Sequence, residues 1–308
     1  MNFYYKFYAN KEWVIAMDIR ALRYFVELVR QQSFTRASER LCVTQPTISK
    51  MVRSLEEEIG EPLLDRQGHS FQLTEAGQLL LARAQSILAE LAQLQSELTD
   101  LQRLRRGRLR LGIPPMVGQI YAPLIRRYRQ RYPEVEISIV EYGGRHLEQA
   151  VSDGELDVAL TMLPTRSGEV LQSLALAEHP VLAVLPGQAE IPAGPLALSD
   201  LQQIPFLLYT HAFTLSERLE QGCQACGFEP TVAARSSQWD FLAAMVRSGM
   251  GVAFLPEPIC RQLDLQELRC QPLTPPLLWR LGVIWHGQRY LSRAAEAWLQ
   301  LCREQQAG

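Results

Sequence analysis

The sequence predicts an α/β multi-domain protein with an N-terminal winged helix-turn-helix, a long linker helix and a larger C-terminal α/β region. Three observations carry this prediction. Short helical patterns flank a three-residue turn near residue 43, an apolar heptad repeat follows, and strand and helix patterns then alternate to the C-terminus. At 308 residues the chain exceeds one average hydrophobic core, which also favours several domains.

Composition narrows the class of protein. Hydrophobic residues make up 47% of the chain, and the formal net charge is −2, so any basic surface for nucleic acid must be local. Six scattered cysteines without a secretory leader favour a reducing compartment, and we expect a cytoplasmic protein. No run approaches the roughly 18 apolar residues that a membrane span needs, so no membrane partner is expected. Residues 1–16 are an N-terminal extension, either native or the product of an upstream start codon.

Three short helices are expected after residue 17. The first covers about residues 19–32, and Ser33 is a plausible N-cap for the second. Residues 42–44 are too few for anything but a tight turn, and Thr44 is then the N-cap of the third helix. Pro46 falls in the first turn of that helix, where backbone N–H groups have no helical partner, so proline is tolerated there.

Two helices joined by a three-residue turn form a helix-turn-helix, whose second helix enters the DNA major groove. Between residues 33 and 53 there are four basic residues and a single glutamate, which is a local positive excess. The residues predicted to contact base edges or phosphates are Thr44, Gln45, Pro46, Thr47, Ser49, Lys50, Arg53 and Arg36. The alternative is a buried helical hairpin in an all-α core, without any role in DNA binding.

A β-hairpin should follow the third helix. Residues 63–73 contain two short strand patterns around a Gln67-Gly68 turn, which is typical of a wing. Arg66 could reach phosphates or the adjacent minor groove, and His69 is more readily a surface residue. The winged helix-turn-helix domain is therefore assigned to residues 17–75.

A long helix opens after Thr74 and, with an arginine-rich hinge, fills residues 76–107. Its apolar positions alternate in steps of four and three: Leu80, Ala84, Ile87, Leu91, Leu94, Leu98 and Leu101. Such a stripe must be buried, and we expect it to pair with the same helix of a second subunit. The predicted dimer contacts are Ile87, Leu91, Leu94, Leu98 and Leu101. Packing against the helix's own domain is the alternative.

The remaining residues alternate between strand and helix patterns, which favours a sheet rich in parallel strands. The expected strands lie at 109–113, 135–140, 156–161, 181–185, 206–209, 252–255 and 281–285. In α/β sheets ligands bind beyond the carboxyl ends of strands, near helix N-termini. The residues that meet this condition are Pro115, Met116, Thr210, His211, Phe213, Ser236, Ser237 and Gln238. Helix capping and core packing are the alternative roles for these side chains.

Catalytic and metal chemistry is not apparent. Cys223 and Cys226 match a C-x-x-C pattern, but no second pair completes a metal site, and the pattern lies late in a helix. A redox-sensing role for this pair is a minor alternative, and the other cysteines are expected to be buried small residues. The sequence lacks a nucleophile elbow, a phosphate-binding glycine loop and a His-x-x-x-His motif. We therefore predict no catalytic residue, no metal, no cofactor and no enzymatic activity.

Four ordered motifs resemble the amino-terminal signature of LysR-type transcriptional regulators. They are ALRYFV at 21–26, SFTRASERL at 33–41, VTQPTISK at 43–50 and LTEAG at 73–77. The resemblance is specific over residues 17–107. Lys50 stands where many relatives have arginine, which keeps the charge and gives up bidentate reading of guanine. Operator sequences of relatives therefore do not transfer to this chain.

The resemblance implies a two-lobed domain like periplasmic binding proteins, with an effector cleft between the lobes. It would occupy residues 108–304, with lobe I at about 108–178 and 282–304, lobe II at about 179–281, and crossovers near 171–180 and 273–279. The implied function is ligand-responsive, sequence-specific regulation of transcription, with a small organic acid as the effector. The implied partners are double-stranded promoter or operator DNA, a second subunit in a homodimer or homotetramer, and RNA polymerase as a further candidate. A solute-binding module for transport and a cysteine-based redox-sensing regulator remain the alternatives.

Overall fold

The computed structural model describes residues 17–67, 70–101, 107–166, 170–191 and 194–306. Residues 1–16, His69 and most of the arginine-rich hinge lie outside the described residues, so what was expected of them stays a prediction. The chain divides near residue 92 into two compact units, which are considered one at a time. None of the helices in the described ranges has the length and apolarity that a membrane span needs.

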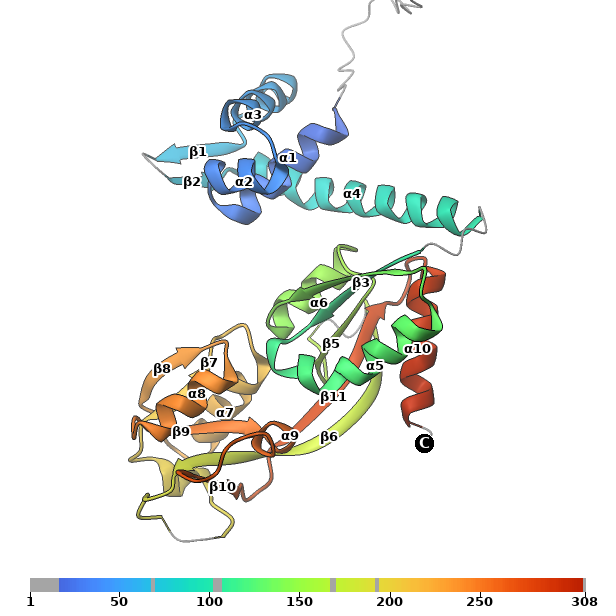
Figure 1. Cartoon of the computed structure of the whole chain (residues 1–308). Coiled ribbons are helices and arrows are strands. Elements are labelled where there is room, and N and C mark those ends of the chain that lie inside the picture. The colour runs from blue at the N-terminus through green and yellow to red at the C-terminus, as the bar shows by residue number, and fades with distance from the viewer. Residues whose placement is uncertain (1–16, 68–69, 102–106, 167–169, 192–193, 307–308) are drawn as a thin grey trace, which may run out of the picture. The chain divides into compact units, whose positions relative to one another are not determined.

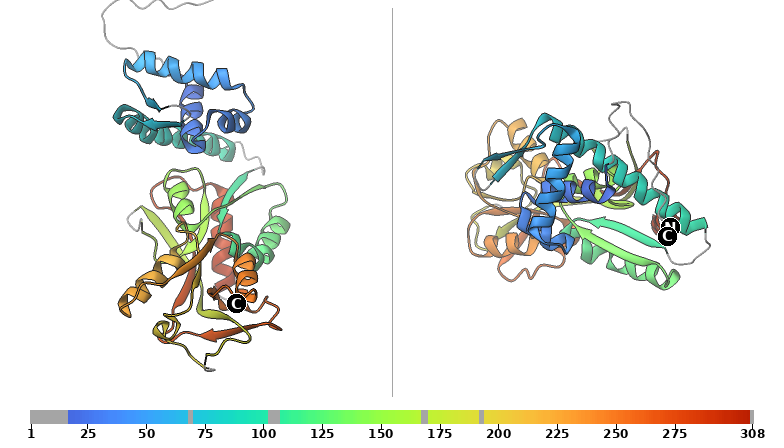
Figure 2. Two further views of the ribbon diagram at one scale, coloured as in Figure 1. Left: turned by 90° about the vertical axis from the view of Figure 1, so that its left-hand side faces the viewer. Right: turned by 90° about the horizontal axis from the view of Figure 1, so that it is seen from above.

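Three short helices form the core of the first unit: α1 (Ile19–Gln31), α2 (Phe34–Leu41) and α3 (Gln45–Ile59). The Ser33 hydroxyl accepts a hydrogen bond from the Arg36 backbone N–H, which confirms it as the N-cap of α2. Phe25 of α1 and Ile48 of α3 are fully buried against each other's helices in one hydrophobic core. Figure 2 shows α3 and the helix that follows the wing on opposite sides of this unit.

Helix α3 begins as the sequence predicts, with Pro46 in its first turn and Thr44 as the N-cap residue. One detail of the prediction is wrong, because the Thr44 side chain does not cap a backbone amide. Its Oγ1 instead lies 2.8 Å from Oγ1 of Thr47. Gly60 ends the helix with φ of 78°, a left-handed conformation that glycine adopts without steric cost.

The wing consists of the antiparallel strands β1 (Leu64–Gln67) and β2 (Ser70–Leu73). At its base, Thr74 Oγ1 donates to the Pro62 carbonyl at 2.6 Å and accepts from the Gly77 N–H at 3.0 Å. A Cβ atom at Gly77 would lie 2.1 Å from the Leu63 carbonyl oxygen, so only glycine fits there. The LTEAG motif therefore fixes the wing to the first turn of helix α4 (Glu75–Leu101).

The apolar stripe of α4 divides into two parts. Leu80 and Ala84 are buried in the core of the winged helix-turn-helix. For these two residues the alternative prediction, packing of the helix against its own domain, is correct. Ile87, Leu94 and Leu98 are 47%, 49% and 50% exposed, although all three are large apolar side chains. The second part therefore offers an uncovered apolar surface, and only this part fits the predicted contact with another subunit.

The second unit contains one mixed sheet that passes through two lobes. In the first lobe β3 pairs in parallel with both β4 and β5, and helices cover this half of the sheet (Figure 1). The elements of the first lobe are β3 (Arg108–Ile113), the short 3-10 helix η1 (Pro115–Val117), α5 (Gly118–Arg131), β4 (Glu136–Glu141), α6 (Gly144–Ser152), β5 (Val158–Met162) and α10 (Arg293–Gln306).

In the second lobe β7 pairs in parallel with both β8 and β9. Helices α7 and α8 follow β7 and β8 in the chain, as expected for an α/β arrangement. The elements of this lobe are η2 (Leu198–Leu201), β7 (Phe206–Tyr209), α7 (Thr214–Ala225), β8 (Val232–Ser236), α8 (Trp239–Arg247), β9 (Val252–Pro256), α9 (Glu257–Cys260) and β10 (Leu268–Pro272).

Two long strands connect the lobes, β6 (Leu171–Pro186) and β11 (Leu278–His286) (Figure 1). The first half of β6 pairs antiparallel with β11, and its second half pairs antiparallel with β9 and β10. Residues 171–180 form the first half of β6, and the crossovers expected near residues 171–180 and 273–279 thus lie on or beside the two strands that connect the lobes. The antiparallel strands β6, β10 and β11 also make the sheet more mixed than the predicted parallel-rich sheet. The proposed lobe boundaries stay a prediction, although the exchange of partners along β6 falls close to them.

Candidate functional site

Helix α3 has two chemically different faces. Ile48, Val52 and Leu55 are at most 1% exposed and pack into the core of the first unit. The opposite face carries side chains that are exposed to solvent: Gln45, Pro46, Thr47, Lys50 and Arg53. Ser49 is half-buried between the two faces. A helix anchored by one face and polar on the other can enter a groove without unfolding its own domain.

The start of α3 offers hydroxyl groups to a phosphate. Its amides contribute little, because Pro46 has no N–H and the Thr47 N–H donates to the Thr44 carbonyl at 3.0 Å. The Thr44 and Thr47 hydroxyls are exposed at this end of the helix. Arg36 is exposed on α2, where one guanidinium nitrogen donates to the Gln31 carbonyl at 2.8 Å. Arg66 lies on β1 opposite Phe71, and nothing is described of its side chain.

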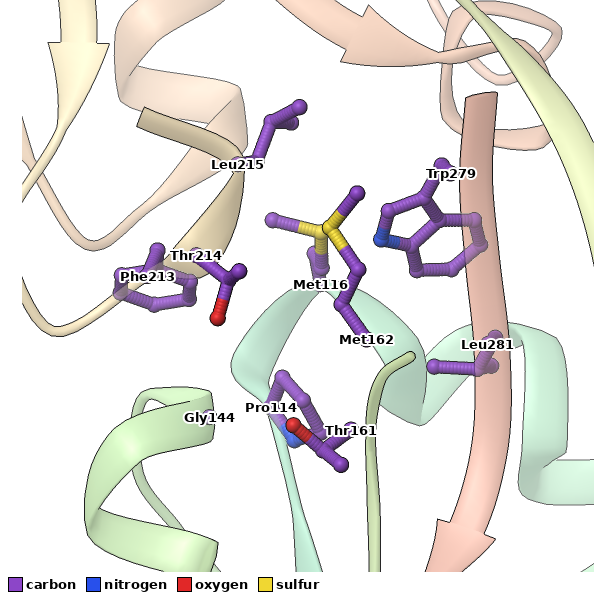
Figure 3. Close-up of a pocket in the computed structure, with 10 residues that line it drawn as sticks. All are labelled: Pro114, Met116, Gly144, Thr161, Met162, Phe213, Thr214, Leu215, Trp279 and Leu281. Carbon is purple, nitrogen blue, oxygen red and sulfur yellow. The ribbon is translucent and has the colours of Figure 1, made fainter. Parts of the chain in front are cut away.

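A pocket lies between the two lobes of the second unit (Figure 3). It is lined by Pro114, Met116, Gly144, Thr161, Met162, Phe213, Thr214, Leu215, Trp279 and Leu281. Its hollow measures about 320 Å³ with its open mouth included. Part of this volume is open solvent, and the space between the lining side chains has room for little more than one water. A larger ligand therefore requires the flexible side chains of Met116 and Met162 to move aside.

Polar groups reach this pocket from both lobes. Helices α6 and α7 start at its wall, at Gly144 and Thr214, and neither has a side-chain cap on its first-turn amides. A Cβ atom at Gly144 would lie 2.7 Å from Thr161 Oγ1, so glycine keeps this part of the wall open. At Gly143 a Cβ atom would lie 2.5 Å from the Ala212 carbonyl oxygen of the other lobe. The two neighbouring glycines thus allow the lobes and the threonine hydroxyl to approach closely.

A buried carboxyl group lies behind the pocket wall. The Glu148 side chain accepts hydrogen bonds from Thr161 Oγ1 at 3.4 Å and from the Arg166 backbone N–H at 3.1 Å. Burial raises the pKa of Glu148 above its usual range, and the charges of Arg166 and Arg145 partly offset that effect. The carboxyl group therefore orients Thr161 without facing the pocket as an uncompensated negative charge.

Ion pairs join the lobes beside the pocket. The Glu217 carboxylate, in the first turn of α7, binds the Arg145 guanidinium at 2.7 Å and also pairs with Arg166. Arg218, its neighbour on α7, donates to the Leu163 carbonyl of the first lobe at 2.9 Å. The hydrogen bond from Arg145 lowers the pKa of Glu217 below its usual value. Glu217 is therefore ionised at neutral pH and holds the two lobes together next to the ligand site.

The pocket contains two of the residues predicted for effector binding, Met116 and Phe213. Pro115 is adjacent to the wall without lining it. Thr210 and Ser236 are half-buried neighbours linked by a backbone hydrogen bond of 3.2 Å, and both lie outside the lining. Side chains that are exposed and do not line the pocket are His211, Ser237 and Gln238. A role for these residues in effector binding stays a prediction.

Several residues at this site were not foreseen from sequence. Thr161 was recognisable in principle, because it is a polar residue at the end of an otherwise apolar strand, where ligands of α/β proteins bind. Trp279 gave no such sign, since this strand was not expected to begin before residue 281, and Leu281 was expected only as the first residue of the strand. Arg145 is half-buried in the ion pairs between the lobes.

The cysteines do not support the C-x-x-C alternative. Burial is the main factor that raises the pKa of the Cys223 thiol, to about 11, so this thiol is protonated and unreactive at neutral pH. Cys226 is exposed. The expectation that the remaining cysteines are buried is wrong for Cys42, which is exposed and has φ of 54° at the end of α2. In the described ranges no group of three or more His, Cys, Asp or Glu side chains could hold a metal ion.

The fold and these two sites define a winged-helix DNA-binding protein with a two-lobed effector-binding domain. Residues 19–78 match the bacterial regulatory helix-turn-helix proteins of the lysR family, and residues 102–307 match the LysR substrate binding domain. The chain therefore belongs to the LysR family of transcriptional regulators. It is a DNA-binding regulator, and its C-terminal unit is the effector-binding domain of the family.

Individual relatives agree with this assignment. The uncharacterized HTH-type transcriptional regulator YwbI of Bacillus subtilis (strain 168) is 39% identical and aligns with 92% of this chain and 95% of its own. The HTH-type transcriptional regulator BudR of Raoultella terrigena is 34% identical over 78% of this chain and 85% of its own. A solved full-length OxyR variant from Pseudomonas aeruginosa has a TM-score of 0.64 and 25% identity, covering 93% of this chain and 95% of its own. The solved LysR family regulator CbnR has a TM-score of 0.64 at 16% identity, and the alignment covers 94% of this chain and 99% of CbnR. At this low identity the likeness supports the fold alone.

Proposed function

We propose that this regulator responds to a small carboxylate with an apolar body, bound in the pocket between the lobes. The observation that carries the proposal is the composition of the pocket wall. Six of its side chains are large and apolar, namely Met116, Met162, Phe213, Leu215, Trp279 and Leu281. The donors are the Thr214 hydroxyl, the first-turn amides of α7 and the Gly144 amide of α6, since the Thr161 hydroxyl donates to Glu148 and the Arg145 amide to the Ala212 carbonyl. Helix N-termini favour anions, and a single carboxylate matches this small number of donors.

The DNA contacts are proposed for the exposed face of α3. Gln45, Thr47, Lys50 and Arg53 are polar, exposed and carried on one anchored helix. Paired subunits would present two such helices to DNA, and the uncovered apolar part of α4 supplies a surface for that pairing. We further infer action in the cytoplasm, on promoter or operator DNA and in contact with RNA polymerase, as a homodimer or homotetramer. These inferences rest on membership of the family.

The ion pairs between the lobes suggest how a ligand acts on the rest of the molecule. A ligand that displaces Met116 and Met162 changes the space between the lobes, and Glu217 and Arg145 lie directly beside that space. The effect of the ligand then depends on how much better it binds one arrangement of the lobes than another. We infer that such rearrangement changes the geometry in which the paired winged helices bind DNA.

The effector class is tested by calorimetry on the full-length protein with benzoate and with benzamide. The two probes share an apolar ring and differ in charge, so the proposal predicts binding of benzoate and at least tenfold weaker binding of benzamide. Thr214→Val keeps the shape of the side chain and removes its hydroxyl, and it should weaken benzoate binding. Thr231→Val, the same change at an exposed position outside the pocket wall, is the matched control. Equal binding of both probes, or binding of neither, would contradict an apolar carboxylate.

A further inference from the structure

Helix α6 presents two residues to strand β5 at the pocket. Gly144 and Glu148 are four positions apart, so both lie on one face of the helix, and α6 packs on β5. Thr161 of β5 meets both of them. Its Oγ1 lies 3.4 Å from Glu148 Oε1 and would lie 2.7 Å from a Cβ atom on Gly144. Thr161 and Gly144 line the pocket, whereas Glu148 is buried and does not. The carboxyl group therefore acts on a ligand only through Thr161.

The hydrogen bonds of Glu148 decide what Thr161 offers to the pocket. Glu148 Oε2 accepts from the Arg166 backbone N–H at 3.1 Å, and Oε1 accepts from the Thr161 hydroxyl. Both carboxyl oxygens are thus acceptors, as in an ionised carboxyl group, and the nearby Arg145 and Arg166 charges favour that form. A threonine hydroxyl has a single proton. Because Thr161 gives this proton to Glu148, only its oxygen lone pairs remain for a ligand.

The opposite lobe offers the other kind of group. Thr214 begins α7, and its Oγ1 would lie 3.7 Å from the same Cβ position on Gly144. Figure 3 shows the Thr161 and Thr214 hydroxyl oxygens in the part of the pocket near Gly144, one carried by β5 and one by α7. The Thr214 hydroxyl and the first-turn amides of α7 can donate, whereas Thr161 accepts. A ligand that satisfies both sides needs an acceptor toward α7 and a donor toward β5, because an unpaired buried polar group weakens binding.

We propose that the effector is a carboxylate whose apolar body carries a neutral hydrogen-bond donor, a hydroxyl or an amino group, and that Glu148 is the positioning residue that selects this donor. The inference rests on the proposed function and narrows its ligand class. The carboxylate binds at the start of α7, and the donor binds Thr161 Oγ1. Thr161 is fully buried before a ligand enters, so the donor reaches it when Met116 and Met162 move aside, as any larger ligand requires.

Calorimetry on the full-length protein with 3-aminobenzoate and 3-formylbenzoate tests this selection. The two probes carry a small polar group at the same ring position, but the amino group donates and the formyl group only accepts. A solution at about pH 8 keeps the amino group neutral and favours the ionised form of Glu148. We expect 3-aminobenzoate to bind at least about fivefold more tightly, because a formyl oxygen would face the lone pairs of Thr161. Equal affinities, or tighter binding of 3-formylbenzoate, would overturn the proposal.

Glu148→Gln tests the role of the carboxyl group with little change in shape. The glutamine oxygen can accept from the Arg166 N–H, and its NH2 group then donates to Thr161 and frees the Thr161 proton for the ligand. The preference should therefore reverse in favour of 3-formylbenzoate. Neither the sizes of the probes nor a general loosening of the fold produces such a reversal. Glu229→Gln, at an exposed position, is the matched control and should keep the preference of the parent protein. An unchanged preference in Glu148→Gln would refute the selection by Glu148.

Two threonine variants keep the proposal testable if Glu148→Gln does not fold. Thr161→Val removes the acceptor, so the preference for 3-aminobenzoate should largely disappear. Thr214→Val should weaken both probes alike and leave their ratio unchanged. A Thr161→Val protein that keeps the full preference would refute the proposal. If the parent protein binds neither unsubstituted benzoate nor either probe, the proposed carboxylate class fails. If it binds benzoate but does not discriminate between the two probes, that class stands and the donor proposal alone fails.

Discussion

Replacing Lys50 by alanine should separate DNA binding from folding. The Lys50 side chain is exposed on α3, and a surface substitution of this kind changes the free energy of unfolding by no more than about 0.5 kcal/mol. Ile48, two residues earlier on the same helix, is 0% exposed, and its replacement by alanine should cost about 2–5 kcal/mol. The two substitutions therefore have very different expected effects on stability although they lie within one turn of the same helix.

The loss of DNA affinity can be bounded from the same geometry. A contact from lysine to a base edge contributes about 1–3 kcal/mol, which corresponds to roughly 5–150-fold in affinity for each half-site. If Lys50 instead contacts a phosphate, the loss should be uniform across DNA sequences, and the salt dependence should decrease by about one unit per subunit.

Fluorescence anisotropy with DNA fragments recovered by genomic footprinting measures this loss at several salt concentrations. Thermal unfolding of the same samples provides the control. If Lys50→Ala unfolds as readily as Ile48→Ala, the helix is part of a core on both faces and cannot enter a groove. If both stability and DNA affinity are unchanged, α3 enters DNA in another orientation, and the assignment of its exposed face is wrong.

Three further substitutions test other parts of the molecule. Leu94→Asp places a charge in the exposed apolar stripe of α4 and should dissociate the dimer, with an unchanged mass by light scattering as the contradicting result. Gly144→Ala would bring a methyl group to 2.7 Å from Thr161 Oγ1, so benzoate binding should fall at least tenfold in calorimetry while DNA binding persists. Glu217→Gln removes the ion pair with Arg145, and the resulting loss in melting temperature should be largest at neutral pH. The folded-state pKa of Glu217 is lowered, so the ion pair stabilises the protein fully above the unfolded pKa of about 4.5. This stabilisation is lost as the pH falls through the folded pKa. A difference in melting temperature between parent and variant that grows in acid would refute this account.

The first hundred residues could be predicted closely because their structure is decided by neighbours in the chain. Ser33 caps α2, Pro46 fits the first turn of α3, and Gly60 ends that helix, each through contacts within a few residues. Thr44 occupies the predicted N-cap position, but its hydroxyl bonds another side chain in place of a backbone amide. Local patterns therefore specified the elements and left the hydrogen-bonding detail open.

The pocket was harder to predict because its wall comes from five separate segments of the chain. Phe213 and Met116 were expected from their positions after strands, and this rule worked because it reflects local topology. Trp279 reaches the pocket from β11, whose pairing with β6 joins residues about a hundred positions apart. Residues 171–180 alternate in polarity only weakly and end in proline, which hides a strand that gains its partners at long range. Pairing of this kind is a property of the whole fold and has no signature in a short window.

The junction between the wing and α4 has a consequence for operator architecture. Because Gly77 touches the Leu63 carbonyl and Thr74 bonds on both sides of the junction, α4 and the DNA-reading unit rotate as one body. The separation of two such units along DNA is then dictated by the heptad alignment of the paired helices. A slip by one heptad displaces one reading head relative to the other by about 10 Å, close to the rise of three base pairs. The alignment of the leucine stripes therefore determines the spacer length between half-sites.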